Sequence, residues 1–316
     1  MLLFIQALTL ILVLGMAALA IILLMAAARL RPPRLTDAKA LYLLGRLTPA
    51  DLGFTFETLR FTVDHPTSHR PVRLAAWLVP HPQAQGRTVI LIHGYSDAKI
   101  GAAAWLPMLH RQHVNILLID LPGHGDSEPH LCTSGLHERH MVSQLIDAFQ
   151  TQFPDRAGNL SMFGISMGGA IALATACLRT DIAAVMMDCP YSDFRHAVIS
   201  HAWLFGLPGR IFQVPATAIT EYLLNIRFAD VAPILLLPQC PCPVLLIQGG
   251  DDYLISTEDA AEMRRLVSAR ADGLSSAIVI KDAPHILGLA TDPESYENSV
   301  AEFMQVTSKA QRRSPQ

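Results

Sequence analysis

One serine in this chain lies in a sequence context that could make its hydroxyl a nucleophile. Ser166 stands between Gly164 and Gly168 in a G-x-S-x-G pattern, directly after an apolar run at residues 160–163 and directly before a small-residue run at residues 170–174. A serine at a sharp strand-to-helix turn adopts a strained backbone, and flanking glycines let the neighbouring chain approach closely. The pattern therefore predicts an exposed, nucleophilic Ser166. The alternative is a glycine-rich helix start that this serine merely caps.

A serine hydroxyl needs a base and a carboxylate that orients the base, and the later part of the chain offers both. His285 follows an apolar run at residues 277–280, which is the last predicted strand. Asp251 and Asp252 follow two glycines just after the apolar run at residues 244–247. The order serine, acid, histidine predicts a catalytic triad. Spacing alone does not separate the two aspartates.

The negative charge that develops on an attacked carbonyl oxygen also needs hydrogen-bond donors. We expect the backbone N–H of Met167, next to the nucleophile, and the N–H of Tyr95, in the turn after residues 89–92, to form this oxyanion hole. His93 lies in the same turn, but it precedes the serine in the chain. We interpret it as a structural residue of the turn.

The elements that must position these residues alternate along the chain. Short apolar runs, typical of strands buried on both faces, are separated by helical patterns, which predicts an α/β fold with a mostly parallel sheet covered by helices on both faces. Residues 54–63 and 72–79 predict an opening antiparallel pair. Further strands are expected at residues 89–92, 116–119, 160–163, 182–187, 244–247 and 277–280, and helices at residues 102–110, 137–153, 167–178, 257–267 and 294–306.

This alternation is interrupted once and ends before the C-terminus. Amphipathic stretches at about residues 194–238 predict a small helical cap within a domain that covers residues 52–307. The polar residues 308–316 are expected to form a disordered tail.

The N-terminus carries an unusually apolar segment. All 51 charged residues of the 316-residue chain lie outside residues 2–28, and the mean hydropathy of the whole chain is +0.32. At ~1.5 Å per residue such a helix spans a ~30 Å bilayer core, so residues 1–28 predict one transmembrane anchor, followed by a linker at residues 29–51. A cleaved signal peptide is the alternative, but the run is too long and no Lys or Arg precedes it. Basic residues that follow the run predict a cytoplasmic domain: they are Arg29, Arg31, Arg34 and Lys39.

Several other classes of protein are excluded or disfavoured by the sequence. The net charge is −3 and no basic block lies beside aromatic residues, so nucleic acid is not an expected partner. Glycine-rich nucleotide-binding patterns do not follow any predicted strand, and no cofactor or metal is predicted. The five scattered cysteines predict reduced thiols, and Cys240 and Cys242 lack the second pair that a zinc site needs. His137 and His140 are expected on a solvated helix face.

Taken together, these motifs resemble the α/β-hydrolase family over about residues 52–307. Residues 120–127 resemble the family's D-x-R-G-H-G-x-S loop, with Pro122 in place of the arginine, and residues 248–255 resemble H-G-x-x-D-x-x-V, with Gln248 in place of the histidine. The second resemblance selects Asp252 over Asp251 as the acid. It implies an α/β-hydrolase fold with a small cap, in a subgroup of mostly esterase-like serine hydrolases.

The sequence therefore predicts a serine hydrolase that cleaves carboxylic esters through an acyl-enzyme, with Ser166 as nucleophile, His285 as base and Asp252 as the orienting acid. A membrane anchor makes a lipophilic ester, an acyl thioester or a lipid the expected substrate. Two alternatives remain open at this point. One is a serine peptidase or amidase with the same triad, and the other is a non-catalytic scaffold with this fold.

Overall fold

One eight-stranded sheet organises the computed structural model, which describes residues 1–35, 37–204 and 209–313. The strand order is β1-β2-β4-β3-β5-β6-β7-β8. The pairs β1–β2 and β2–β4 are antiparallel, and the remaining neighbours are parallel. The strands are β1 (Glu57–Asp64), β2 (Pro71–Val79), β3 (Arg87–Ile92), β4 (Asn115–Ile119), β5 (Asn159–Ile165), β6 (Ile182–Asp188), β7 (Val244–Gly249) and β8 (Ser276–Ile280). The predicted mostly parallel α/β architecture is confirmed.

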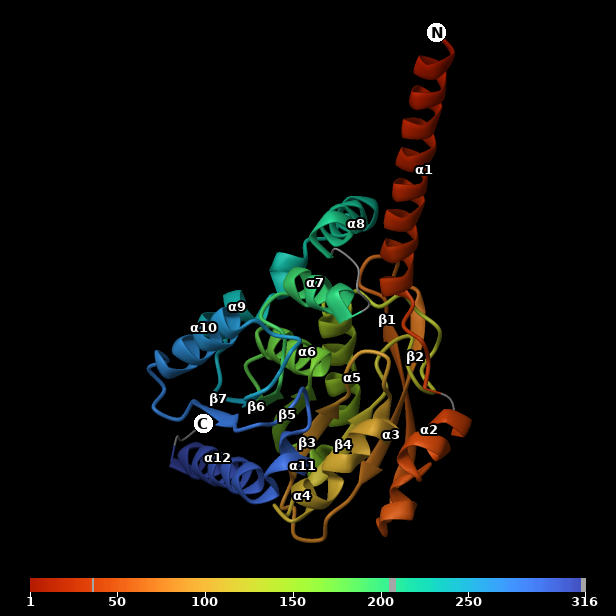
Figure 1. Cartoon of the computed structure of the whole chain (residues 1–316). Helices are drawn as coiled ribbons and strands as arrows, with labels where there is room; N and C mark the ends of the chain where they lie inside the picture. Colours follow the sequence, from red (N-terminus) through yellow and green to blue (C-terminus); the bar gives the residue numbers. More distant parts are fainter. Residues whose placement is uncertain (36, 205–208, 314–316) are drawn as a thin grey trace.

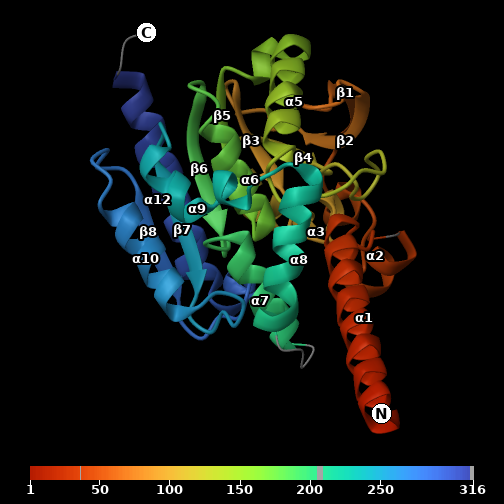
Figure 2. The ribbon, with the colours of Figure 1, turned by 90° about the horizontal axis from the view of Figure 1, so that it is seen from above.

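Helices cover both faces of this sheet (Figure 1, Figure 2). The α-helices are α1 (Leu2–Leu30), α2 (Asp37–Leu44), α3 (Lys99–Ala102), α4 (Leu106–His110), α5 (Glu138–Gln152), α6 (Met167–Ala176), α7 (Phe194–Leu204), α8 (Gly209–Leu224), α9 (Pro233–Leu236), α10 (Thr257–Ser268), α11 (Gly288–Thr291) and α12 (Pro293–Arg313). Short 3-10 helices lie at η1 (Pro49–Leu52), η2 (Ala103–Trp105), η3 (Pro154–Arg156), η4 (Phe228–Val231) and η5 (Leu237–Gln239).

The apolar core is divided between the two faces of the sheet. On one face, side chains of α5, α6 and α10 pack against the sheet, with Phe149 and Ile171 fully buried. On the other face, α3, α4 and α12 supply the cover, with Leu106 and Tyr296 fully buried. Strands β3 and β4 are buried along almost their whole length, which explains why their sequences show unbroken apolar runs rather than alternation.

Residues 29–51, which the sequence predicts to be a linker and juxtamembrane segment, contain helical structure. Helix α1 continues to Leu30, and helix α2 then packs onto the domain, where Ala40 is buried in the same core as Trp77. Only eight residues form α2, so its isolated pattern is too short to predict a helix. Tertiary packing stabilises it instead.

The prediction of a disordered tail at residues 308–316 is wrong for residues 308–313, which are helical. Helix α12 runs to Arg313, and residues 314–316 lie outside the described part of the chain. Phe303 and Thr307 are buried and Ala310 is half-buried, so the apolar stripe of the helix continues past the predicted end of the domain at residue 307.

Two further expectations about helices also differ from the structure. The helix predicted at residues 102–110 is divided into α3, η2 and α4, and Pro107 lies in the first turn of α4, where its missing N–H costs little. The start of α5 is not a solvated face. Glu138 is 1% exposed and its carboxylate accepts hydrogen bonds from the Thr133 and Gly135 backbone N–H groups at 2.7 and 2.9 Å.

Helix α1 projects from the domain (Figure 1). Its segment Leu3–Leu24 has a mean hydropathy of 2.9, and none of its most apolar window is buried. One N-terminal helix is therefore long and apolar enough to cross a membrane. The segment predicted as a cap contains α7 and α8 at the end of the domain from which α1 projects.

Candidate active site

Ser166 lies at a strained turn between β5 and α6. Its backbone has φ 53° and ψ −118°, a conformation that non-glycine residues rarely adopt. A Cβ atom at Gly164 would lie 2.1 Å from the Gly168 carbonyl oxygen, and a Cβ at Gly168 would lie 2.3 Å from the Ile92 carbonyl oxygen. Both glycines are therefore required for close backbone packing, and together they hold the serine at the end of the strand.

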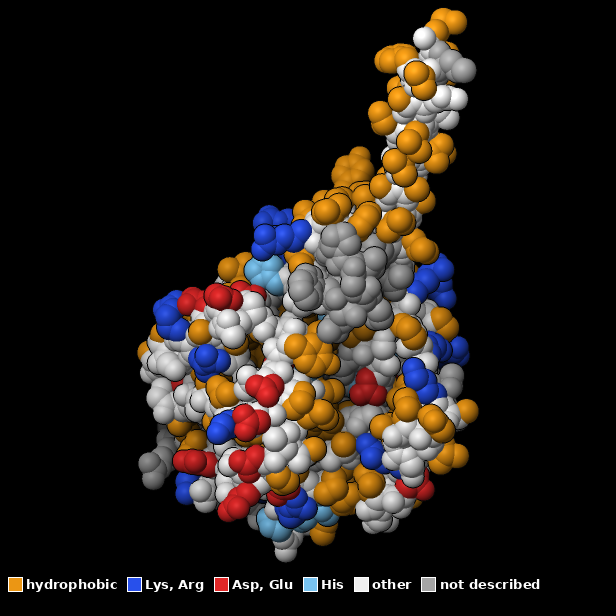
Figure 3. Space-filling view, in the orientation of Figure 1, with side chains coloured by type: hydrophobic (Ala, Val, Ile, Leu, Met, Phe, Trp, Pro, Cys, Tyr) orange, Lys and Arg blue, Asp and Glu red, His pale blue; other side chains and the backbone are white. Residues whose placement is uncertain are grey.

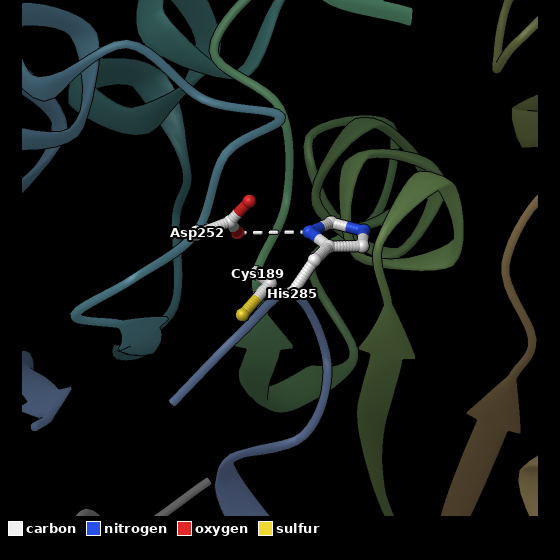
Figure 4. A group of neighbouring side chains, drawn as sticks. All are labelled: Cys189, Asp252 and His285. Carbon is white, nitrogen blue, oxygen red and sulfur yellow. Dashed lines mark hydrogen bonds and ion pairs between the residues drawn. The ribbon is translucent and has the colours of Figure 1, made fainter. Parts of the chain in front are cut away.

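The structure brings the three residues predicted as a triad together. The Ser166 Oγ–His285 Nε2 distance is 2.9 Å, and the His285 Nδ1–Asp252 Oδ2 distance is 2.8 Å. The His285 side chain is 13% exposed and that of Asp252 only 5%. Figure 4 draws the hydrogen bond between these two side chains as a dashed line. The neighbouring Asp251 is exposed and its side chain lies outside this chain of hydrogen bonds. Geometry thus agrees with the choice of Asp252.

Local structure fixes the orientation of each member. Asp252 follows β7, and its second oxygen, Oδ1, accepts a hydrogen bond from the Leu254 N–H at 2.9 Å. His285 follows β8 and donates from Nδ1 to the carboxylate. Its Nε2 is then the acceptor for the Ser166 hydroxyl proton. This arrangement can remove a proton from the serine as it attacks a carbonyl carbon.

The two expected oxyanion donors lie at the same cavity as the serine. Tyr95 and Met167 both line it, and Met167 is the first residue of α6. The backbone next to Tyr95 is close to Ser166, because a Cβ at Gly94 would lie 3.4 Å from the Ser166 Cβ. A helix N-terminus also carries a partial positive charge that favours an anion.

His93 is buried in the turn after β3 and does not face the serine hydroxyl. Its Nδ1 donates to the Gly94 carbonyl oxygen at 2.7 Å, and its Nε2 accepts from the Leu121 N–H at 3.1 Å. Burial lowers the pKa of His93 well below its usual value, so the ring stays neutral. Its role is to join two loops, as expected from the sequence.

Comparison with known proteins decides the family. A family model described as "Alpha/beta hydrolase family" matches residues 89–298, more than half of the chain. The chain belongs to the α/β-hydrolase family.

The relatives of this hydrolase include enzymes and proteins without a described activity. A hydrolase of (E)-2-((N-methylformamido)methylene)succinate from Acinetobacter baylyi is 24% identical over 260 residues, covering 71% of this chain and 93% of the relative. The uncharacterized protein YfhR of Salmonella typhi is 25% identical over 260 residues, covering 76% of each chain.

Solved structures show the same fold. The esterase Pf2001 of Pyrococcus furiosus superposes with a TM-score of 0.67 at 20% identity, covering 87% of this chain and 98% of the esterase. A bacterial membrane phospholipase A superposes with a TM-score of 0.54 at 17% identity, covering 98% of this chain and 99% of the phospholipase.

The cavity at Ser166 in this hydrolase has a volume of about 360 Å³ and is walled by the cap. Phe194, Ala197 and Val198 of α7 supply apolar surface, and Gln213 of α8 lies among them. Gln213 is 6% exposed, and its Oε1 has no hydrogen-bond partner in the described part of the chain. A buried amide oxygen without a partner is unfavourable to the stability of the fold.

Two carboxyl groups near the site were not singled out from the sequence. Asp97 lines the cavity, and burial raises its pKa to about 6. Asp188 ends β6 in full burial, accepts a hydrogen bond from the Tyr296 hydroxyl at 2.7 Å, and has its pKa raised to about 6 by that burial. Asp188 ends a strand and Asp97 follows one, near the strand ends at which the predicted triad residues lie, and this placement was the available signal in the sequence.

Cys189, Asp252 and His285 lie close enough to share a metal ion, with their ligand atoms within 4.8 Å of one another. Figure 4 shows the imidazole and the carboxylate directed at each other, with the sulfur of Cys189 pointing away from the bond between them. Burial and two nearby carboxylates raise the pKa of the Cys189 thiol well above its usual value. Since metals bind the thiolate, this chemistry favours a hydrogen-bonded pair over a metal site.

Proposed function

We propose that this hydrolase is a serine hydrolase of carboxylic esters that works through an acyl-enzyme. The observation that carries the proposal is the continuous chain of hydrogen bonds from Ser166 through His285 to Asp252, at 2.9 and 2.8 Å, at the wall of an apolar cavity. A buried carboxylate that fixes the imidazole tautomer is the arrangement that activates a serine hydroxyl.

In the first half of the proposed reaction, Ser166 Oγ forms a bond to the ester carbonyl carbon while its proton moves to His285 Nε2. The carbonyl oxygen becomes an anion that the Tyr95 and Met167 backbone N–H groups stabilise. The tetrahedral intermediate then loses the alcohol, which takes the proton from His285. The acyl group remains on the serine oxygen.

In the second half, water attacks the acyl carbon and His285 takes a proton from that water. The bond between the carbonyl carbon and Ser166 Oγ breaks, and the serine regains its proton from His285. The products are the free carboxylic acid and the enzyme in its starting state. No group outside the chain is needed to balance the reaction.

We also propose that α1 attaches the enzyme to a membrane, with the catalytic domain on the cytoplasmic side, and that its substrate is a lipophilic ester or a lipid. The apolar wall of the cavity and the charge-free residues 2–28 support this proposal. In sealed vesicles that keep the cytoplasmic side of the membrane inside, added protease is expected to leave the domain intact, because the membrane separates the two. Digestion of the domain in intact cells would contradict the orientation.

The reaction class is tested with matched substrates that share one acyl group. Hydrolysis of a p-nitrophenyl butyrate ester at a rate well above that of the corresponding anilide supports the esterase. Preference for the anilide or for aminoacyl amides would favour an amidase. Absence of turnover with every ester, thioester and amide in a folded preparation would favour a scaffold.

A further inference from the structure

The polar and apolar side chains of helix α8 lie on the opposite sides from those expected for a helix that faces water. Apart from Arg210 in its first turn, its exposed side is apolar, whereas polar side chains on the other side are buried. The exposed side chains are Ile211 (65%), Val214 (54%), Tyr222 (85%) and Leu223 (68%), and the buried ones are Gln213 (6%), Thr217 (4%) and Thr220 (3%). A cap helix that faces water shows the opposite distribution. The exposed side of α8 is therefore suited to an apolar environment.

The exposed apolar residues form a continuous stripe. Residues 211, 214, 218 and 222 follow the three- and four-residue spacing of one helix face, and all are exposed. We call these four residues the α8 stripe. The buried threonines need no water, because Thr217 and Thr220 donate to carbonyl oxygens one turn earlier, at 2.7 and 2.8 Å.

Helix α8 packs beside α1, and the contact extends into the segment that can cross a membrane. Among the described side chains of residues 3–30, only Ala18, Ile22 and Leu30 are half-buried and only Ala26 is buried. These positions are four residues apart, so they form one stripe of α1. Helix α8 lies along α1 (Figure 1, Figure 2), and the Leu30 carbonyl oxygen at the end of α1 accepts a hydrogen bond from the Cys132 N–H of the domain.

This contact sets the depth of α8 relative to the candidate span. Ala18 lies six residues inside the end of the candidate span at Leu24. At ~1.5 Å per residue, the α8 contact reaches about 9 Å into that span. Helices that lie in a membrane surface bury their apolar faces to about 5–10 Å. Figure 3 shows hydrophobic side chains continuing from α1 onto the adjoining end of the domain.

We infer that the α8 stripe lies in the lipid bilayer, beside the point where α1 leaves it. The opposite side of the same helix carries Gln213, which lines the cavity at Ser166. The wall of the active-site cavity is thus one helix thick toward the membrane, and the enzyme takes its ester substrate from the bilayer rather than from water. The inference rests on the proposed membrane attachment, and its experiments separate the two.

The first experiment places a polarity-sensitive nitrobenzoxadiazole dye on the full-length chain in phosphatidylcholine vesicles. Val214→Cys carries the dye on the α8 stripe, and Val279→Cys is the matched control, because Val214 is 54% and Val279 47% exposed. Val279 belongs to β8 in the body of the domain. The unmutated chain corrects for reaction of the natural cysteines. Quenching is measured with phosphatidylcholine that carries a nitroxide on its acyl chain.

The inference predicts blue-shifted emission and strong quenching at position 214, with neither at position 279. Equal, water-like emission at both positions would overturn it, while resistance of the protein to alkaline extraction would still support attachment through α1. Blue-shifted emission at position 214 without nitroxide quenching, and dependent on the protein-to-lipid ratio, would also overturn it. That outcome would assign the stripe to a second copy of the chain.

The second experiment compares Val214→Asp with Val279→Asp in the same vesicles. Val214→Asp is expected to hydrolyse an ester embedded in the bilayer about tenfold more slowly than the unmutated enzyme, the loss that corresponds to one buried valine. Hydrolysis of a soluble butyrate ester is expected to be unchanged in both variants. An equal loss on both substrates, or none on either, would contradict membrane docking. Failure of the unmutated enzyme on both esters would instead contradict the proposed function.

Discussion

Replacing Asp252 with asparagine is expected to leave the fold intact and to move the imidazole proton of His285 from Nδ1 to Nε2. One carboxylate oxygen accepts the Leu254 N–H at 2.9 Å, and the other accepts His285 Nδ1–H at 2.8 Å. The Leu254 N–H requires an oxygen, so the asparagine amino group must face His285. An N–H donor at that place forces Nδ1 to accept, and the imidazole proton then lies on Nε2. A protonated Nε2 cannot take the proton of Ser166.

The expected loss of kcat for Asp252→Asn is about 10⁴-fold, or about 5.4 kcal/mol in the activation free energy. Turnover of a soluble ester gives kcat, and thermal unfolding shows whether the variant is folded. Asp251→Asn is the matched control, because that aspartate is exposed and adjacent, and its rate is expected within about twofold of the unmutated enzyme. A folded Asp252→Asn enzyme within tenfold of the original rate would refute the proposed role of this carboxylate.

Three further substitutions test the surroundings of the triad. Gly168→Ala places a Cβ 2.3 Å from the Ile92 carbonyl oxygen, so a loss of at least about 2 kcal/mol in unfolding free energy is expected by urea titration; an unchanged midpoint would contradict the close packing. Gln213→Leu removes the buried Oε1 without a partner, so stability should rise by about 1 kcal/mol, and a fall in melting temperature would show that the amide is satisfied. Asp188 has a pKa of about 6 in the fold against 3.8 ordinarily, so its contribution to stability falls as pH rises through that interval. The unfolding free energy of Asp188→Asn, relative to that of the unmutated protein, should therefore rise by about 3 kcal/mol between pH 3 and pH 7. A difference in unfolding free energy that does not change with pH would contradict the raised pKa of Asp188.

Much of the site could be predicted because its signals are local in the sequence. The strand, turn and helix around Ser166 are specified by an apolar run, two glycines and a small-residue helix. Asp252 follows the buried strand β7 and His285 follows the edge strand β8, and parallel strands bring their carboxyl ends to one edge of the sheet. Only the choice between Asp251 and Asp252 needed more than order and spacing, and the family resemblance supplied it.

What the sequence did not reveal depends on contacts between distant segments. Helix α2 is too short to be recognised, yet Ala40 is buried against the domain. Glu138 looks like an exposed helix residue until the loop at Thr133 folds over it. The orientation of α8 likewise depends on contacts with distant segments of the chain. Its polar and apolar residues can be placed on two faces from the sequence, but only the fold shows that the polar face is buried.

The most direct test of the central claim is whether Ser166 is an activated nucleophile. The full-length enzyme is treated with a fluorophosphonate probe, beside Ser166→Ala and a heat-denatured sample of the unmutated protein. We expect covalent labelling of the folded enzyme alone. Absence of labelling in a folded, unmutated protein, or labelling that persists in Ser166→Ala, would contradict the account.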